Sequence, residues 1–145
     1  MFIAAVDVGS PPKMGWASNR GHLGCADPTA LVHAIENEFS NGRPVALGFE
    51  APLWIPRGRE FVRMTSNRGG IEQTMRRPWS AGAGCGSLAA GVANMAWIFE
   101  ALYTLSGAVR ATTLPTRLED GSAQLLIWEY PSGVGRLAWI GSERS

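Results

Sequence analysis

Three acidic residues, Asp7, Glu50 and Glu129, each lie at or next to the carboxyl end of an apolar run. A charged group on a buried strand is costly unless it is paired, hydrated or bound to a metal. Open α/β sheets place their ligands at the carboxyl ends of their strands. The three acids are therefore candidate site residues, and metal-assisted or acid–base chemistry is what they could perform.

Asp7 and Glu50 are expected to end neighbouring strands, so their side chains could lie about 5 Å apart on a shared face. Carboxylates this close repel, so one must take up a proton or a cation must lie between them. Mg²⁺ (or Mn²⁺) prefers oxygen ligands and could activate water for in-line phosphoryl displacement. Glu129, one strand farther out, is expected to orient ligands or bind a water. The alternative for each acid is a solvated strand end or an arginine partner.

Arginines crowd one Gly-rich segment, where only Glu60 and Glu72 oppose them. Arginine suits bidentate contacts to phosphate or carboxylate. We expect the arginines, with the single lysine Lys13, to contact a nucleic-acid substrate; a solvated loop is the alternative. The net charge of +1 gives no overall nucleic-acid signature. The arginines concerned are Arg57, Arg59, Arg63, Arg68, Arg76 and Arg77.

The first half of the chain reads as strands around one helix. Residues 2–8, 14–19 and 21–26 are expected strands, the last two joined by a tight hairpin turn. A helix is expected from Asp27 as N-cap, with Pro28 at the first helical position, to a stop at Asn41 and Gly42. Residues 45–50 form the expected fourth strand.

The second half begins with an irregular stretch over 53–86, which is too long for a passive connection and is expected to be a functional loop. A helix is expected over 87–106 with Ser87 as N-cap, then a loop over 107–122 and a fifth strand over 124–130. The glycine-rich residues 82–87 could cradle a phosphate at the helix N-terminus. A flexible loop that lets the helix pack closely is the reading we favour there.

The long helix is expected to bury an apolar stripe. Trp97 and Trp128 are expected in the core, whereas Trp54 and Trp79 could either stack bases or anchor the arginine segment. The stripe consists of Leu88, Val92, Met95, Phe99, Leu102 and Tyr103.

These elements predict an α/β fold with a five-stranded mixed sheet. Three antiparallel strands come first, and two right-handed crossovers then add parallel strands beside the first, which gives the order 3-2-1-4-5. Helices are expected to pack on the sheet.

The chain is expected to form a single domain over 1–145, since its length suffices for one core. We find no apolar run of membrane-spanning length and no signal peptide, so no membrane partner is expected. Cys25 and Cys85 make no disulfide framework, which favours a reduced, cytoplasmic protein. An exposed edge on the third or fifth strand would permit a homodimer.

Three pieces of the sequence carry a resemblance. They are Val6-Asp7-Val-Gly9 with Gly15-Trp16, then Gly48-Phe49-Glu50-Ala51-Pro52-Leu53, then Trp128-Glu129-Tyr130-Pro131. Together with their order and spacing they resemble the domain of unknown function 429 family, predicted nucleases of the ribonuclease H-like superfamily.

The resemblance implies a two-metal-type nuclease site with Asp7 and Glu50 as metal-binding carboxylates and Glu129 in support. Two departures are visible. An Asp-Pro pattern is usual at the fourth strand, where this chain has Glu50-Ala-Pro52. Many superfamily nucleases take a last acid from a helix after the fifth strand, and only Glu143 follows here, which would fit a truncated C-terminus or an acid from a partner.

Two other functions remain open. One is a non-catalytic module on the same fold that binds a nucleotide or nucleic acid through its arginines and needs no metal. The other is an actin-like nucleotide-binding fragment, since that group also opens with Asp-x-Gly on its first strand, but the chain is too short for two lobes.

Overall fold

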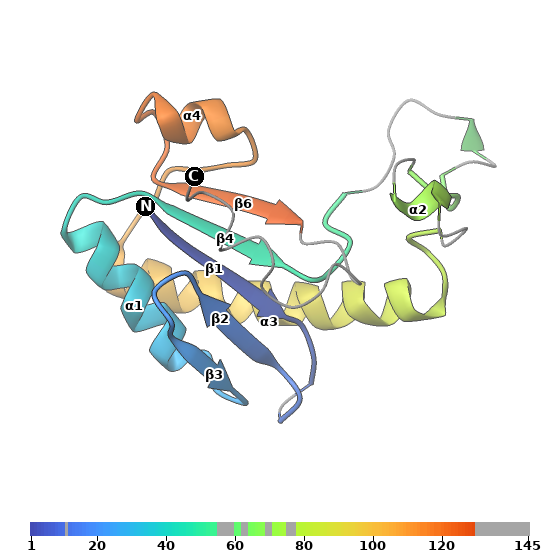
Figure 1. Ribbon diagram of the computed structural model, residues 1–145, viewed down its shortest axis with the longest axis horizontal. Coiled ribbons are helices and arrows are strands. Elements are labelled where there is room, and N and C mark those ends of the chain that lie inside the picture. Colours follow the sequence, from blue (N-terminus) through green and yellow to red (C-terminus); the bar gives the residue numbers. More distant parts are fainter. Residues whose placement is uncertain (11, 55–59, 62–63, 69–70, 75–77, 130–145) are drawn as a thin grey trace, which may run out of the picture.

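The computed structural model describes residues 1–10, 12–54, 60–61, 64–68, 71–74 and 78–129, and its centre is a six-stranded sheet (Figure 1). The strands are β1 (Phe2–Asp7), β2 (Gly15–Ser18), β3 (Leu23–Cys25), β4 (Val45–Phe49), β5 (Ala111–Thr112) and β6 (Leu125–Glu129). The helices are α1 (Thr29–Ser40), α2 (Ile71–Thr74), α3 (Gly82–Ser106) and α4 (Pro115–Glu119).

The sheet order is β3-β2-β1-β4-β6-β5. β1 and β2 pair antiparallel, as do β2 and β3, whereas β1, β4, β6 and β5 run parallel. The predicted α/β fold and strand order are confirmed, and the topology is ribonuclease H-like. β6 is the predicted fifth strand, and the two-residue β5 is an additional strand at the edge.

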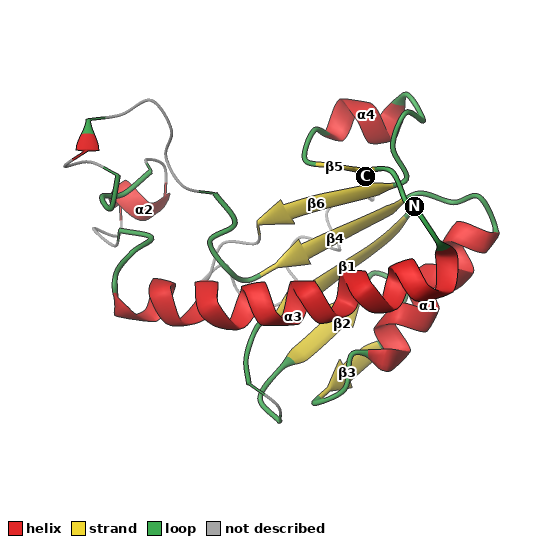
Figure 2. Cartoon of the chain, turned by 180° about the vertical axis from the view of Figure 1, so that it is seen from behind, coloured by secondary structure: helices red, strands yellow, loops and turns green. Residues whose placement is uncertain are grey.

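One face of the sheet carries the core. Side chains alternate along each strand, so Phe2, Ala4 and Val6 of β1 share a face with Leu47 and Phe49 of β4. All five are essentially inaccessible to solvent. Helices α1 and α3 cover this face together (Figure 2). Removing this apolar surface from water is the main force that holds the helices on the sheet.

Helix α1 follows the prediction closely. The Asp27 carboxylate accepts a hydrogen bond of 2.8 Å from the Thr29 N–H, although Pro28 occupies the cap position and the helix begins at Thr29. Asn41 ends the helix, and Gly42 has φ +66°, a left-handed conformation that glycine adopts without strain.

Helix α3 starts five residues earlier than predicted. It begins at Gly82 with Ala81 as its cap, so Ser87 is not the N-cap and the predicted glycine loop is helical. A Cβ atom built on Gly84 would lie 1.9 Å from the Trp79 carbonyl oxygen. Gly84 therefore lets the preceding chain cross directly over the first turn, and this close approach outweighs the low helix propensity of glycine.

The predicted apolar stripe of α3 needs partial correction. Leu102 of the stripe is buried and Met95 and Phe99 pack against the core, as predicted, but Val92 and Tyr103 are exposed, as is Trp97. Gly91 and Ile98 are buried on this face in addition. Periodicity alone misses this because small residues line the contact with the sheet. By length and composition alone, residues 84–106 of this helix could cross a membrane, and 17% of their most apolar stretch is buried; the expectation of no membrane partner stays a prediction.

Two segments that were predicted as irregular contain regular structure. Helix α2 lies within residues 53–86, whereas β5 and α4 lie within 107–122. Pro115 begins α4, where its fixed φ suits the first turn. Leu118 of α4 is buried, so one apolar residue is enough to hold this short helix on the domain.

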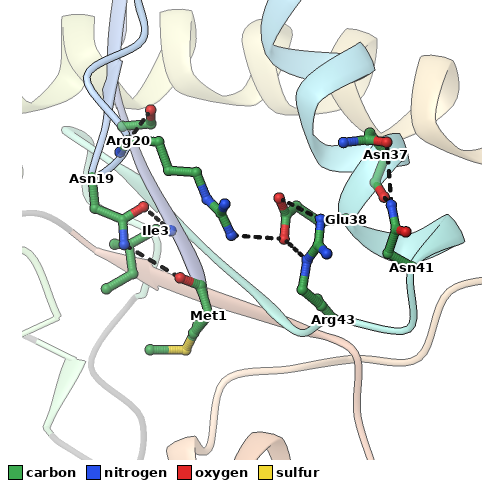
Figure 3. A network of polar contacts seen from close by, with 9 residues as sticks. Met1, Ile3, Asn19, Arg20, Asn37, Glu38, Asn41 and Arg43 are labelled. Atoms are coloured by element: carbon green, nitrogen blue, oxygen red, sulfur yellow. Dashed lines mark hydrogen bonds and ion pairs between the residues drawn. The ribbon is translucent and has the colours of Figure 1, made fainter.

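Glu38, near the end of α1, is the one charged residue among the described part that is buried. Arg43 donates to its carboxylate at 2.6 Å and Arg20 at 3.2 Å (Figure 3). The hydrogen bond from Arg43 lowers the pKa of Glu38 below its ordinary value, against the opposing effect of burial. This cluster joins α1 to the β2–β3 hairpin and to the loop before β4, at the end of the sheet away from the predicted site.

Candidate functional site

Asp7 and Glu50 lie at the ends of adjacent parallel strands, as predicted. Val6 of β1 is paired with Phe49 of β4, and the Glu50 N–H extends the ladder by donating to the Val6 carbonyl at 2.8 Å. Asp7 and Glu50 each follow a residue of that pair, so the alternation of the strands directs both to the face opposite the helices. Asp7 is exposed and Glu50 is half-buried.

Small residues surround this pair of carboxylates on their face of the sheet. Ala5 and Gly48 are paired one step before them, and Asp7 itself is paired with Gly15 of β2. Trp128 of β6 lies flat against Gly48: a Cβ atom built on Gly48 would be 2.6 Å from the indole ring. Trp128 therefore covers Gly48, two residues before Glu50, and is half-buried, where a core position was predicted.

Helix α3 packs closely against the residues that follow β1 and β4, on the face opposite Asp7 and Glu50. A Cβ atom built on Gly91 would be 2.7 Å from the Ala51 Cβ and 3.8 Å from the Val8 side chain. Val8 and Ala51 come directly after Asp7 and Glu50. The lack of a side chain at Gly91 thus lets one helix pack close to both strand ends.

Asn94, one turn further along α3, holds the chain after β1. Its side-chain oxygen accepts a hydrogen bond from the Gly9 N–H at 3.1 Å, and its amide donates to the Gly9 carbonyl at 3.2 Å. Asn94 is a positioning residue that sequence reasoning missed. Asn94 lies off the predicted apolar stripe, so the sequence pattern gave no signal for it.

Glu129 is held by the long loop. Arg68 donates to both of its carboxylate oxygens, at 2.7 and 2.5 Å, and the Leu53 N–H donates to one of them at 3.0 Å. Arg68 also donates to the Trp54 carbonyl at 3.1 Å. Glu129 and Arg68 are each about one-fifth exposed at the side chain. The structure thus uses Glu129 to fasten the loop onto the strand ends.

The side chain of Glu129 also lies on the face of the sheet that the helices cover, opposite to Asp7 and Glu50. It is paired with Phe49, whose side chain points toward the helices, whereas Asp7 and Glu50 are one residue further along. Among the residues that the structure describes, no group of three His, Cys, Asp or Glu side chains could hold a metal ion together. The strand register therefore puts two of the three predicted acids, Asp7 and Glu50, at neighbouring strand ends on one face.

The predicted basic residues are only partly placed. Lys13 is exposed in the turn between β1 and β2, where its N–H donates to the Ser10 carbonyl at 2.6 Å. Arg68 is engaged by Glu129, as described above. The other predicted phosphate contacts lie outside the described residues: Arg57, Arg59, Arg63, Arg76 and Arg77.

The two tryptophans that flank the arginine segment make backbone contacts. The Trp79 indole N–H donates to the Met64 carbonyl at 3.0 Å, and the Ser80 hydroxyl donates to the Thr65 carbonyl. Trp79 and Ser80, just before α3, are therefore bonded to the main chain of Met64 and Thr65. Trp54 is about half exposed beside Arg68.

The chain matches no protein-family model, and neither the curated proteins nor the solved structures yield a match. Its topology and the geometry of its strand ends are therefore the basis for any functional assignment.

Proposed function

We propose that this protein is a divalent-metal-dependent phosphodiesterase that acts on nucleic acid, with Asp7 and Glu50 as the residues that hold the metal. The observation that supports the proposal is the pairing of Val6 with Phe49, because the residues that follow them, Asp7 and Glu50, end neighbouring strands on one face of the sheet. The ribonuclease H-like topology and the resemblance to the domain of unknown function 429 family agree with it.

The donor set fits one Mg²⁺ or Mn²⁺ ion. These ions accept one or two protein carboxylates and keep several waters, so Asp7 and Glu50 suffice for a single ion. When bound, the ion would supply an activated water and a positive charge for a phosphoryl group. The described residues offer no third acid on that face, so a single-ion site is better supported than the two-metal arrangement.

The chain's own residues have distinct parts in this proposal. Asn94 would hold the chain just after Asp7 through its bonds to Gly9, and Gly91 would let α3 pack close to the residues after both acids. Lys13, in the turn after β1, is exposed and could approach a phosphate from the same edge of the sheet. Glu129 acts indirectly, since its pairing with Arg68 holds the loop that carries the remaining arginines.

The second candidate is a binding module on the same fold that takes nucleic acid or a nucleotide without a metal. The observation that favours it is the engagement of Glu129 by Arg68, which removes from the site the third acid that a nuclease of this class would use. Such a module would bind through the arginines of its long loop, and its affinity would fall as salt rises.

Cleavage and binding assays separate the two functions. The unmodified protein should cleave DNA, RNA or junction substrates only with Mg²⁺ or Mn²⁺, and Glu50→Gln should reduce the rate by about a hundredfold or more. Glu119→Gln, an exposed acid on α4, is the matched control and should cleave normally. Binding that persists in EDTA and in Glu50→Gln, with no cleavage of any substrate, would establish the binding module instead.

A further inference from the structure

The outward surface of α3 is apolar along most of its length, and Figure 2 shows this helix as the outermost layer over its face of the sheet. Val92 is 55% exposed, Trp97 46% and Tyr103 67%. Contiguous apolar surface of this kind on a folded domain marks an interaction site. We define the outward face of α3 as Ala89, Val92, Ala93, Ala96, Trp97, Glu100 and Tyr103.

We propose that this face docks a second copy of the same chain, with the two α3 helices antiparallel and Ala96 at the two-fold axis. The proposal does not depend on the proposed function.

Spacing supports a helix as the partner. Ala89, Ala93 and Ala96 recur at intervals of four and three residues, and all three are exposed. This is the spacing of a seam between two long helices. Alanine side chains at such a seam let two helices approach closely, so that their flanking side chains meet.

Shape supports an antiparallel copy. At 3.6 residues per turn, Trp97 flanks the alanine seam on one side, whereas Val92 and Tyr103 flank it on the other. With Ala96 on the axis, Tyr103 of one copy lies level with Ala89 and near Val92 of the other. The two Trp97 side chains then lie next to each other, since each is one residue from the axis. In this arrangement Tyr103 of one copy meets the small Ala89 of the other, and the two Trp97 side chains meet each other.

Charge supports the same direction. Glu100 is the only charged residue on the outward face. In a parallel pair the two Glu100 carboxylates would meet at the same level and repel. In the antiparallel pair they are about 12 Å apart along the axis, which is beyond the screening length of about 8 Å at physiological salt. The opposed helix dipoles also favour this direction.

The surface area that the dimer would bury indicates how tightly the two copies should associate. The exposed parts of Trp97 and Tyr103 amount to roughly 200 Å² per copy. With Val92 and the alanine seam, a pair would bury on the order of 800–1,000 Å² in total, which is at the small end of specific interfaces. We therefore expect a dimer with a micromolar dissociation constant.

Sedimentation velocity on the full chain tests the proposal across a range of micromolar concentrations. The unmodified protein should shift from monomer to dimer, and Ala96→Glu should weaken association by about a hundredfold, because it places two buried charges at the axis. His33→Glu, which adds a carboxylate at an exposed position of α1, is the matched control and should still dimerise. Circular dichroism verifies that each variant is folded.

Disulfide trapping is the second measurement. In a background of Cys25→Ser and Cys85→Ser, Ala96→Cys should form an interchain disulfide under mild oxidation, whereas His33→Cys should not. A monomer at about 100 µM, or a dimer that Ala96→Glu leaves intact, overturns the proposal. So does a monomeric protein that floats with phosphatidylcholine vesicles, which would assign this face to a lipid surface.

Discussion

Asn94 and Gly9 exchange two hydrogen bonds across the edge of the sheet, at 3.1 and 3.2 Å, although 85 residues separate them in the chain. The bonds satisfy both main-chain groups of the first glycine after Asp7. One side chain of α3 thereby determines where the carboxyl end of β1 lies, and with it one half of the proposed metal site.

Replacing Asn94 by Ala should therefore lower the free energy of unfolding by about 1–3 kcal/mol, because Gly9 loses both partners in a partly buried place. It should also weaken Mn²⁺ binding although no carboxylate is altered. Urea denaturation and Mn²⁺ titration provide the measurements. Asn94→Asp keeps the acceptor for the Gly9 N–H and should lose less stability; an equal loss in both variants would show that the acceptor does not matter.

Adding a methyl group at Gly91 should destabilise the protein, whereas adding one at Gly86 should stabilise it. Gly91→Ala would place a Cβ 2.7 Å from that of Ala51, so α3 or the end of β4 must shift. We expect a loss of about 1–3 kcal/mol. Gly86→Ala has nothing within 4 Å of its added Cβ and should gain about 0.5–1 kcal/mol from helix propensity. Thermal or urea unfolding of both variants checks the contrast; two gains would mean that the helix is not in close contact there.

The Glu38 cluster should make stability depend on pH. The hydrogen bond from Arg43 lowers the pKa of Glu38 in the folded state. This contribution is complete above the ordinary glutamate pKa of about 4.3 and is lost as the pH falls through the lower folded-state value. Glu38→Gln should lose about 2 kcal/mol at neutral pH and flatten the acid limb of the stability curve. Stability curves of the two proteins that run parallel below that pH would contradict this.

Arg68 and Glu129 should be strongly coupled. A double-mutant cycle with Arg68→Ala and Glu129→Gln should give a coupling free energy of about 1–3 kcal/mol for unfolding, because the pair is bidentate and mostly shielded from solvent. A cycle of Arg68→Ala with Glu119→Gln is the control and should give none. Coupling below about 0.5 kcal/mol would indicate that the contact is no stronger than an ordinary surface pair.

The sequence was sufficient for the sheet apart from the short edge strand β5, because the signals of the other strands are local. The turn after β2, the Asp27–Thr29 contact and the Gly42 stop each fix an element by short-range chemistry, and right-handed crossovers then leave one strand order. The adjacency of Asp7 and Glu50 follows from that order. These parts needed no knowledge of long-range packing.

The errors arise where tertiary contacts outweigh local preference. Trp79 crosses closely over Gly84, which is helical, and the buried face of α3 includes Gly91 because the helix lies close to Ala51 there. The pairing of Glu129 with Arg68 joins residues 61 positions apart across an irregular segment. No periodicity in the chain reports a contact of that kind.

The central claim is that Asp7 and Glu50 hold one divalent cation between them. A crystal of the full chain soaked in Mn²⁺ tests it directly. Anomalous density between the two carboxylates, absent from a crystal of Glu50→Gln, is the result that we predict. Carboxylates directed away from each other, or bound to arginine with no anomalous density nearby, would contradict the account.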